Sequence, residues 1–328
     1  MHSTLCFKTF LSFTSVATSY QNAAPRYYSL APRKCYMKAS SAYNLEPEAE
    51  ILRLLMFTKM LRNTGNLPLE KSADHIAEMG FDGADLTVRP GGYVLPEEAA
   101  LKLPEAITTL KSKGLTVPMI TTSITGPEEK HAEEVFKTAS KCDVEYIKLG
   151  YWRYEGFGRL KGQIEKAREE LDGIYALSKK HDVTATVHTH AGAFLSADPA
   201  LVFLLLKDYD PEWLGAYIDP GHMFAEIGPS GWEMGIDLLA PYIKLMAVKN
   251  YRWLRVVDEK TGEKRWRIRM APLKEEIVPW PNVFECLRKI GFDGCVSLHS
   301  EYEDLNLGEL IQQTREDLDY VKNVLKNI

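Results

Sequence analysis

Residues 78–86 read E-M-G-F-D-G-A-D-L, and residues 288–298 read R-K-I-G-F-D-G-C-V-S-L. Both stretches have the same order: the end of a helical pattern, a turn that contains glycine, and a short apolar run typical of a buried strand. Gly80 stands where helices commonly end in the left-handed conformation. Two copies of one helix–turn–strand junction predict a repeating βα unit.

The same alternation of short apolar runs and helical patterns extends from residue 51 to the C-terminus. Strands are expected at 54–58, 84–88, 117–123, 146–150, 184–189, 214–218, 244–248 and 295–298, and helices at 70–79, 97–113, 128–141, 160–180, 199–206, 232–239, 283–289 and 307–326. Eight strands, each followed by a helix, predict a single α/β domain over residues 46–328, a (β/α)8 TIM barrel. The competing architecture is a doubly wound open sheet. It would usually carry a glycine-rich phosphate-binding turn after its first strand, and the residues Thr58-Lys59-Met60 do not form one.

The first 45 residues differ in composition from the rest of the chain. They contain no Asp or Glu, five Lys or Arg, and many Ser and Thr. This composition suits an organellar targeting peptide or a weak secretory signal, and a disordered extension of the barrel is the alternative. We expect a soluble protein that is cytoplasmic unless this segment directs it elsewhere.

Charge and cysteine usage exclude several classes of protein. The 328 residues carry a formal net charge of -5, so no basic field is present to bind a nucleic-acid backbone. The five cysteines form no C-x-x-C pair, which argues against a structural zinc site and a disulfide framework. No apolar run reaches the roughly 18 residues of a membrane span. A homo-oligomer remains open.

Polar side chains follow the predicted strands at the points where these strands end, and four of the eight histidines are among them. Carboxyl ends of barrel strands meet at one face, where active sites of TIM barrels lie. We therefore expect one pocket that contains these residues: Asp85, Arg89, Lys148, Tyr151, His188, His190, Asp219, His222, Lys249, Asn250, His299 and Glu301.

Two histidines and one carboxylate in this set predict a metal site. Imidazole and carboxylate are common ligands of divalent Mn, Zn, Fe or Mg, and His188, Asp219 and His299 could supply them. His188 and His190 are two residues apart, so both point to the same side of a strand. The alternative is that each is a hydrogen-bonded polar residue at the barrel mouth.

The motif Asp219-Pro220-Gly221-His222 predicts a sharp turn that directs His222 toward the mouth, where it would bind a substrate hydroxyl or move a proton. Asp219 could instead cap the turn. Lys249 could stabilise a developing oxyanion, or could pair with Asp219 or Glu301.

Other residues of the expected pocket suit substrate binding: Arg89, Asp85, Lys148, Tyr151, Trp253 and His190. Arg89 could instead pair with Asp85, and the aromatic residues could be ordinary packing. Trp253 belongs to residues 251–280, which interrupt the alternation after the seventh strand. We expect this segment to be a lid over the barrel mouth or a surface hairpin.

Four stretches together resemble the sugar phosphate isomerase/epimerase family, the xylose isomerase-like TIM barrels. They are the run 80–92, the Asp219-x-x-His222 pair, the run 248–253 and the run 297–302. The likeness covers residues from about 52 to 305. It implies the fold more specifically than the reaction, because the superfamily includes isomerases, epimerases, endonucleases, dehydratases and lyases.

In the better-known epimerases of that family, a Glu, an Asp, a His and a second Glu hold a divalent metal, usually manganese. The resemblance places His188 and His299 at the two Glu positions, Asp219 at the Asp position, and Ala247 at the position of the metal-binding His. His222 falls on a substrate-binding His. The two Glu positions also carry the proton-moving bases of the family, so this chain departs from it at the bases as well as the ligands.

The pattern is closer to a divergent bacterial branch, in which a lysine on the seventh strand and a His-x-Glu on the eighth are typical. Here these are Lys249 and the pair His299 and Glu301. Tyr93 and Asn250 stand where that branch usually has a His and an Asp.

We therefore predict a sugar or keto-sugar isomerase or epimerase that abstracts a proton next to a carbonyl through an enediolate, with a metal possible but not required. Glu301 or His222 would be the base. The alternatives are a lyase or hydratase acting on keto-glycosides, which uses the same first step, and a non-catalytic sugar-binding barrel. A DNA-repair endonuclease would need a basic face and more metal ligands than the chain offers.

Overall fold

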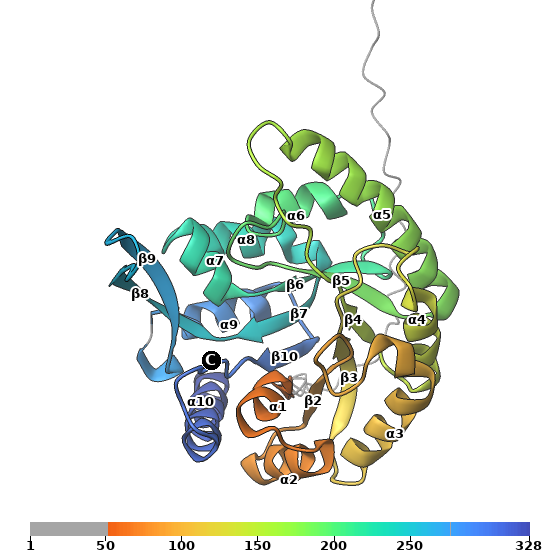
Figure 1. The fold of residues 1–328 in the computed structure, drawn as a ribbon, viewed down its shortest axis with the longest axis horizontal. Coiled ribbons are helices and arrows are strands. Elements are labelled where there is room, and N and C mark those ends of the chain that lie inside the picture. The colour runs from red at the N-terminus through yellow and green to blue at the C-terminus, as the bar shows by residue number, and fades with distance from the viewer. Residues whose placement is uncertain (1–51, 276) are drawn as a thin grey trace, which may run out of the picture. The chain divides into compact units, whose positions relative to one another are not determined.

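Eight parallel strands close into a barrel in the order β1-β10-β7-β6-β5-β4-β3-β2, so the predicted TIM barrel is confirmed and the open sheet is excluded (Figure 1). The computed structural model describes residues 52–275 and 277–328, and the predicted targeting segment lies outside them. The barrel strands are β1 Arg53–Phe57, β2 Gly83–Thr87, β3 Thr116–Thr121, β4 Tyr146–Lys148, β5 Thr184–His188, β6 Leu214–Ile218, β7 Ile243–Val248 and β10 Cys295–Leu298.

The helices surround the barrel (Figure 1). They are α1 Lys59–Gly65, α2 Leu69–Met79, α3 Ala99–Lys111, α4 Ala132–Lys141, α5 Leu160–His181, α6 Pro199–Leu206, α7 Pro220–Ile227, α8 Gly231–Leu239, α9 Trp280–Lys289 and α10 Leu307–Asn327. Short 3₁₀ turns lie at Pro96–Glu98, Ala240–Tyr242 and Leu273–Glu275. None of the helices in the described residues is both long and apolar enough to cross a membrane.

Three helices differ most from the sequence prediction. Helix α4 begins four residues later than expected, because His131 adopts the left-handed conformation (φ 72°) and interrupts the helical pattern. Helix α1 was not predicted, and neither was α7, where the sequence indicated only a turn. Pro220 occupies the first position of α7 and Asp219 caps it. Proline is as favourable at that position as it is in turns.

The strand alternation divides the barrel interior into an apolar floor and a polar mouth. Inward-facing side chains from five strands form a closed apolar cluster, which we call the floor: Leu55, Met119, Tyr217, Leu245, Ala247 and Cys295, with Tyr146 packed against it. Because strand side chains alternate with a period of two, the inward-facing residue that follows a floor residue lies one layer higher. Tyr146, Tyr217 and Ala247 thereby bring Lys148, Asp219 and Lys249 to the mouth.

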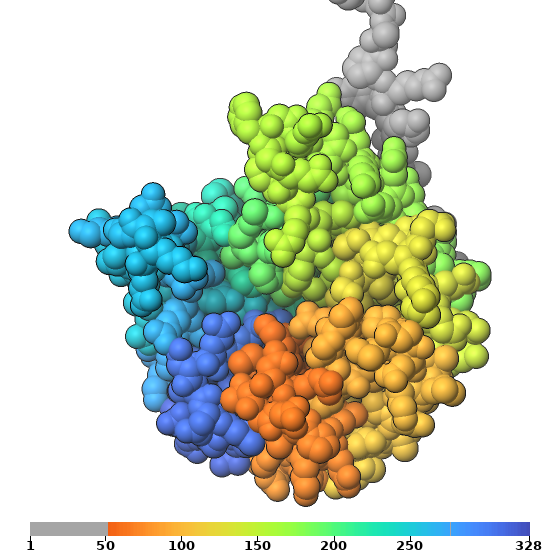
Figure 2. All heavy atoms as spheres, viewed as in Figure 1, coloured from red at the N-terminus to blue at the C-terminus, as the bar shows by residue number. Residues whose placement is uncertain are grey.

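Residues 251–280 contain an antiparallel hairpin, β8 Asn250–Val257 and β9 Lys264–Ala271, paired from Asn250 with Ala271 to Val257 with Lys264. The hairpin extends outward beyond the ring of helices (Figures 1 and 2). Its turn is stabilised by the Asp258 carboxylate, which accepts hydrogen bonds from the backbone N–H groups of Lys260 and Thr261. Of the two expectations for this segment, the hairpin is observed.

Candidate active site

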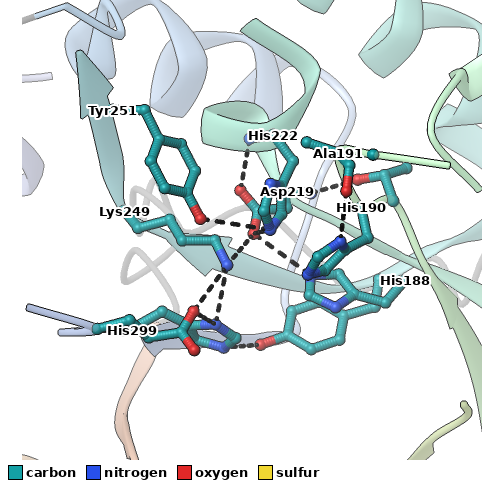
Figure 3. A network of polar contacts seen from close by, with 12 residues as sticks. His188, His190, Ala191, Asp219, His222, Lys249, Tyr251 and His299 are labelled. Atoms are coloured by element: carbon teal, nitrogen blue, oxygen red, sulfur yellow. Dashed lines mark hydrogen bonds and ion pairs between the residues drawn. The ribbon is translucent and has the colours of Figure 1, made fainter. Parts of the chain in front are cut away.

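Lys249 lies at the centre of the polar mouth and is almost completely buried, with 1% of its surface exposed. Its ammonium nitrogen is 3.0 Å from Asp219 Oδ2, 3.1 Å from Glu301 Oε2 and 3.4 Å from His299 Nδ1 (Figure 3). Burial alone would lower the pKa of Lys249, but Asp219, Tyr251 and Glu301 outweigh burial and raise it well above its ordinary value. Lys249 is therefore a fixed cation.

Asp219 uses its two carboxylate oxygens differently. Oδ1 accepts a hydrogen bond of 3.0 Å from the backbone N–H of His222 and so caps α7. Oδ2 accepts no hydrogen bond but lies near three nitrogens: Lys249 Nζ at 3.0 Å, His188 Nε2 at 3.3 Å and His222 Nε2 at 3.7 Å. Burial would raise the pKa of Asp219, but Lys249 and the neighbouring histidines lower it. The carboxylate thus combines the capping role with a place in the pocket.

Four histidines surround this ion pair, and tyrosines orient three of them. The Tyr151 hydroxyl lies 2.9 Å from His188 Nδ1, and the Tyr217 hydroxyl lies 2.8 Å from His299 Nε2. The Tyr251 hydroxyl lies 3.5 Å from His222 Nε2. The ring of His190 is 3.9 Å from that of His222. Burial lowers the pKa of His188 and His222 well below the ordinary value and that of His190 to about 4, and the Lys249 ammonium acts in the same direction on all three. These three imidazoles are therefore neutral at pH 7.

Glu301 lies at the edge of the pocket and is held by two lysines. Its carboxylate contacts Lys249 on one side and forms an ion pair with Lys59 on the other. Burial would raise the pKa of Glu301, but Lys249, His299 and Lys59 together lower it well below its ordinary value. The carboxylate stays ionised and its side chain remains 18% exposed, so it can contact a ligand.

Two adjoining cavities open at this mouth. The smaller has a volume of about 150 Å³ and lies inside the barrel. The larger, of about 660 Å³, lies between the hairpin and the residues that follow β10. His190 and Glu301 line both cavities, so a ligand in one can extend into the other.

The structure brings most of the predicted site residues together. The small cavity is lined by Arg89, Lys148, Tyr151, His188, His190, Lys249, His299 and Glu301, together with Phe57, Lys59, Thr121 and Tyr217. His222 lines the larger cavity. Asp219 lies directly behind Lys249, His188 and His222.

Asp85 and Trp253 line neither cavity. The Asp85 carboxylate is fully buried and accepts hydrogen bonds from Thr121 Oγ1 (2.7 Å) and Ser297 Oγ (3.1 Å). Trp253 is half exposed on β8. Within the described residues, Arg89 forms no ion pair with Asp85; its guanidinium lies 5.7 Å from the ring centre of Phe57.

The sequence did not single out Lys59, Tyr217 or Tyr251 as site residues. Lys59 begins the unpredicted helix α1, and Tyr251 lies in the segment interpreted as lid or hairpin. Tyr217 lies within the apolar run of β6, two residues before Asp219. The alternation of that strand was the available signal, because it directs both side chains inward.

The mouth does not fit a divalent metal as its residues are arranged. No three His, Cys, Asp or Glu side chains in the described parts of the chain are grouped closely enough to hold one. Lys249 places an ammonium group between Asp219 and Glu301, where a second cation would be repelled. Ala247 is part of the apolar floor and has no donor atom.

The fold and site together define a TIM barrel whose polar pocket lies at the carboxyl ends of its strands. The model of the xylose isomerase-like TIM barrel family matches residues 73–324. The chain belongs to this family. No curated protein matches the sequence.

Solved structures with the same fold include several enzymes. A 3-keto-D-glucoside 4-epimerase from E. coli superposes with a TM-score of 0.60 at 12% identity, over 83% of this chain and 100% of its own. A probable 3-DHS dehydratase from Bacillus anthracis superposes with a TM-score of 0.60 at 18% identity, over 82% of this chain and 99% of its own. A xylose isomerase-like protein from Mycobacterium smegmatis, solved with magnesium, superposes with a TM-score of 0.61 at 17% identity, over 85% of this chain and 98% of its own. At these identities the likeness establishes the fold.

Proposed function

We propose that this barrel is an isomerase or epimerase of a sugar or keto-sugar, which abstracts a proton from the carbon next to a carbonyl. The observation that carries the proposal is the buried Lys249 ammonium beside the ionised Glu301 carboxylate, at the edge of a cavity that contains neutral imidazoles. A fixed cation and a nearby base are the two groups that enolisation requires.

The cation and the base depend on each other. A carbonyl oxygen that approaches Lys249 gains negative charge as the adjacent C–H bond breaks, and the ammonium stabilises that charge in a site of low dielectric. The oxygen then competes with Glu301 for the ammonium. Because Lys249 is the main charge that lowers the pKa of Glu301, this competition makes the carboxylate more basic as the proton leaves carbon. His222, which is neutral and faces the larger cavity, is the candidate for relaying a proton from solvent to the carbon.

A second candidate is a lyase or hydratase of keto-glycosides. The larger cavity adjoins the small one and has room for a second group attached to the sugar. Elimination begins with the same proton abstraction and then expels a substituent from the next carbon. The epimerase and the dehydratase that share this fold carry out reactions of both types on their own substrates.

Proton exchange in D₂O tests the proposed function. The protein is incubated with a panel of ketoses and 3-keto-glucosides, and loss of the α-proton signal is followed by NMR. We expect exchange with at least one member, and a decrease of about 10²–10⁴-fold in Glu301→Gln. Glu105→Gln, which makes the same side-chain change on the exposed surface of α3, is the matched control and should exchange like the wild type.

Thermal shift with the same panel separates an enzyme from a sugar-binding protein. Stabilisation by a sugar without exchange would overturn the enzymatic proposal and favour the non-catalytic alternative. Undiminished exchange in Glu301→Gln would overturn the role of Glu301, leaving His222 to be tested as His222→Asn.

A further inference from the structure

The small cavity contains a second buried lysine, Lys148, which the mechanism above does not use. Lys148 is 1% exposed and lines the cavity at the end of β4. Its amine nitrogen forms no hydrogen bond with any described residue, and none of the ion pairs among them includes it. The amine nitrogen lies 3.6 Å from the centre of the Tyr151 ring.

The backbone of β4 fixes this side chain in the cavity. The Lys148 carbonyl accepts hydrogen bonds from the Thr122 backbone N–H (2.9 Å) and the Thr122 hydroxyl (2.8 Å). Tyr146, two residues earlier, packs on the floor, whereas Ile147 faces the outer core. The strand alternation therefore directs Lys148 inward, where no carboxylate of the described residues forms an ion pair with it.

The surroundings favour the uncharged amine. Burial and the Arg89 guanidinium, with the Lys249 ammonium, lower the pKa of Lys148 well below its ordinary value, and they outweigh the Asp85 and Glu301 carboxylates, which raise it. The Tyr151 ring favours a cation, but an aromatic face does not replace a carboxylate in a buried site. An amine that is uncharged, unpartnered and adjacent to a cavity has its lone pair free for a carbonyl carbon.

We propose that Lys148 is the nucleophile that forms a Schiff base with the carbonyl carbon of a keto-sugar bound in the small cavity. This inference rests on the proposed function for the nature of the substrate. The Nζ lone pair attacks the carbonyl carbon, and the C=O π electrons move to oxygen. One proton moves from nitrogen to that oxygen to give a carbinolamine. A second proton, taken from solvent, then adds to the hydroxyl, the C–O bond breaks as water leaves, and the nitrogen lone pair forms the C=N bond of an iminium.

The iminium then takes over the task of the polarised carbonyl. Glu301 removes the α-proton, and the C–H electron pair forms the C=C bond of an enamine while the C=N electrons return to nitrogen. Reprotonation on carbon gives back an iminium, and water releases the product and the free amine. Lys249 keeps Glu301 ionised throughout, so the two lysines have separate tasks.

Reductive trapping tests the proposal. The protein is incubated with each sugar of the panel and sodium cyanoborohydride, and intact mass and peptide mapping follow. We expect one added unit, with the mass of the sugar less one oxygen atom, at Lys148 and not at Lys249. Lys148→Met should abolish the adduct, and Lys102→Met, on the surface, should leave it unchanged. Adducts spread over surface lysines, or located at Lys249, would overturn the proposal.

Acetylacetone provides a probe that requires no knowledge of the sugar. This small diketone converts an uncharged amine into an enaminone that absorbs in the near ultraviolet. An ordinary lysine is uncharged in only about one molecule in 10³ near pH 7.5, so labelling at Lys148 should be about 10²-fold faster than at Lys249 or at surface lysines. Lys148→Arg, which retains a charge, should lose the fast phase.

The two assays separate the failure of each proposal. Proton exchange without fast labelling or trapping at Lys148 would overturn the Schiff base and leave the proposed function standing. Fast labelling at Lys148 without exchange of any sugar would uphold the nucleophile and overturn the proposed reaction. If neither occurs, both are wrong. Since Lys148→Met removes an unpartnered buried polar atom, we expect it to unfold at the same temperature as the wild type or higher, so a lost adduct would not reflect misfolding.

Discussion

The β4 side and the β7 side of the small cavity each contribute one lysine, and the two lysines are in opposite states. Lys148 and Lys249 are equally buried, and each follows an apolar strand. Lys249 faces two carboxylates and is held as a cation, whereas Lys148 faces an aromatic ring and other cations and is held as an amine. Counter-ions, rather than depth of burial, decide the charge of a buried amine.

The largest effect is expected from Lys249→Met. It would leave Asp219 and Glu301 without their shared cation, and removal of one partner from a buried ion pair costs about 3–5 kcal/mol. Urea unfolding at pH 7 measures the loss. Lys148→Met is the matched control, since it makes the same side-chain change in the same cavity and should cost nothing. Equal losses in the two variants would show that burial, not pairing, distinguishes the lysines.

The pH dependence of stability sharpens the comparison. The pKa of Lys148 is lower in the folded protein, so between that pKa and about 10.5 only the unfolded chain binds its proton, and stability rises with pH. The stability of the wild type relative to that of Lys148→Met should therefore rise between pH 7 and pH 9, with a slope of at most about 1.4 kcal/mol per pH unit.

Lys249 should show the opposite behaviour over that range. Because the pKa of Lys249 is raised in the folded protein, Lys249 is protonated in both the folded and the unfolded chain below about pH 10.5. The difference in unfolding free energy between the wild type and Lys249→Met should therefore stay constant from pH 7 to pH 9 and decrease only above about pH 10.5. Urea titrations at several pH values measure both differences. A sloping difference for Lys249→Met, or a flat one for Lys148→Met, would contradict the two charge states.

A smaller effect is expected at acid pH from His190, which faces Lys249 across the cavity. Burial and Lys249 lower its pKa to about 4, against about 6.5 in the unfolded chain, so its contribution is present above pH 6.5 and is lost as the pH falls toward 4. Relative to His190→Gln, the wild type should lose about 1 kcal/mol between pH 7 and pH 5.5. A constant difference would mean that the imidazole is not held neutral.

Metal removal should have no effect, because Lys249 already supplies the cation between Asp219 and Glu301. Treatment with EDTA followed by gel filtration should leave both the melting temperature and the rate of proton exchange unchanged. Restoration of lost exchange by added manganese or magnesium would contradict this reading of the mouth.

The fold could be predicted from the sequence because its signals are local. Every barrel strand coincides with an apolar run, and both bounds of α6 were predicted to the residue. Helix α7 was missed because Pro220 and Gly221 also suit a turn. The Asp219 carboxylate caps α7 by accepting a hydrogen bond from the His222 backbone N–H. The same residue types also occur in turns, so the sequence alone does not distinguish a capped helix from a turn here.

The members of the pocket were predictable, but their pairing was not. The ends of the strands identified Lys148, His188, Lys249 and Glu301. Their states depend on contacts across the barrel, such as Tyr217 with His299 or Lys249 with Asp219, between residues far apart in the sequence. In the sequence both lysines simply follow an apolar strand. The sequence therefore did not reveal that Lys249 is a cation paired with two carboxylates, or that Lys148 is an amine without an ion-pair partner.

The apolar floor has a consequence for traffic through the site. Leu55, Met119 and their neighbours seal the described barrel from below, and the small cavity lies above this seal. A cavity that is closed at its base has a single entrance, so substrate and product cannot pass at the same time. Product should therefore act as a purely competitive inhibitor, and it must leave through the entrance beside the hairpin before the next substrate can bind.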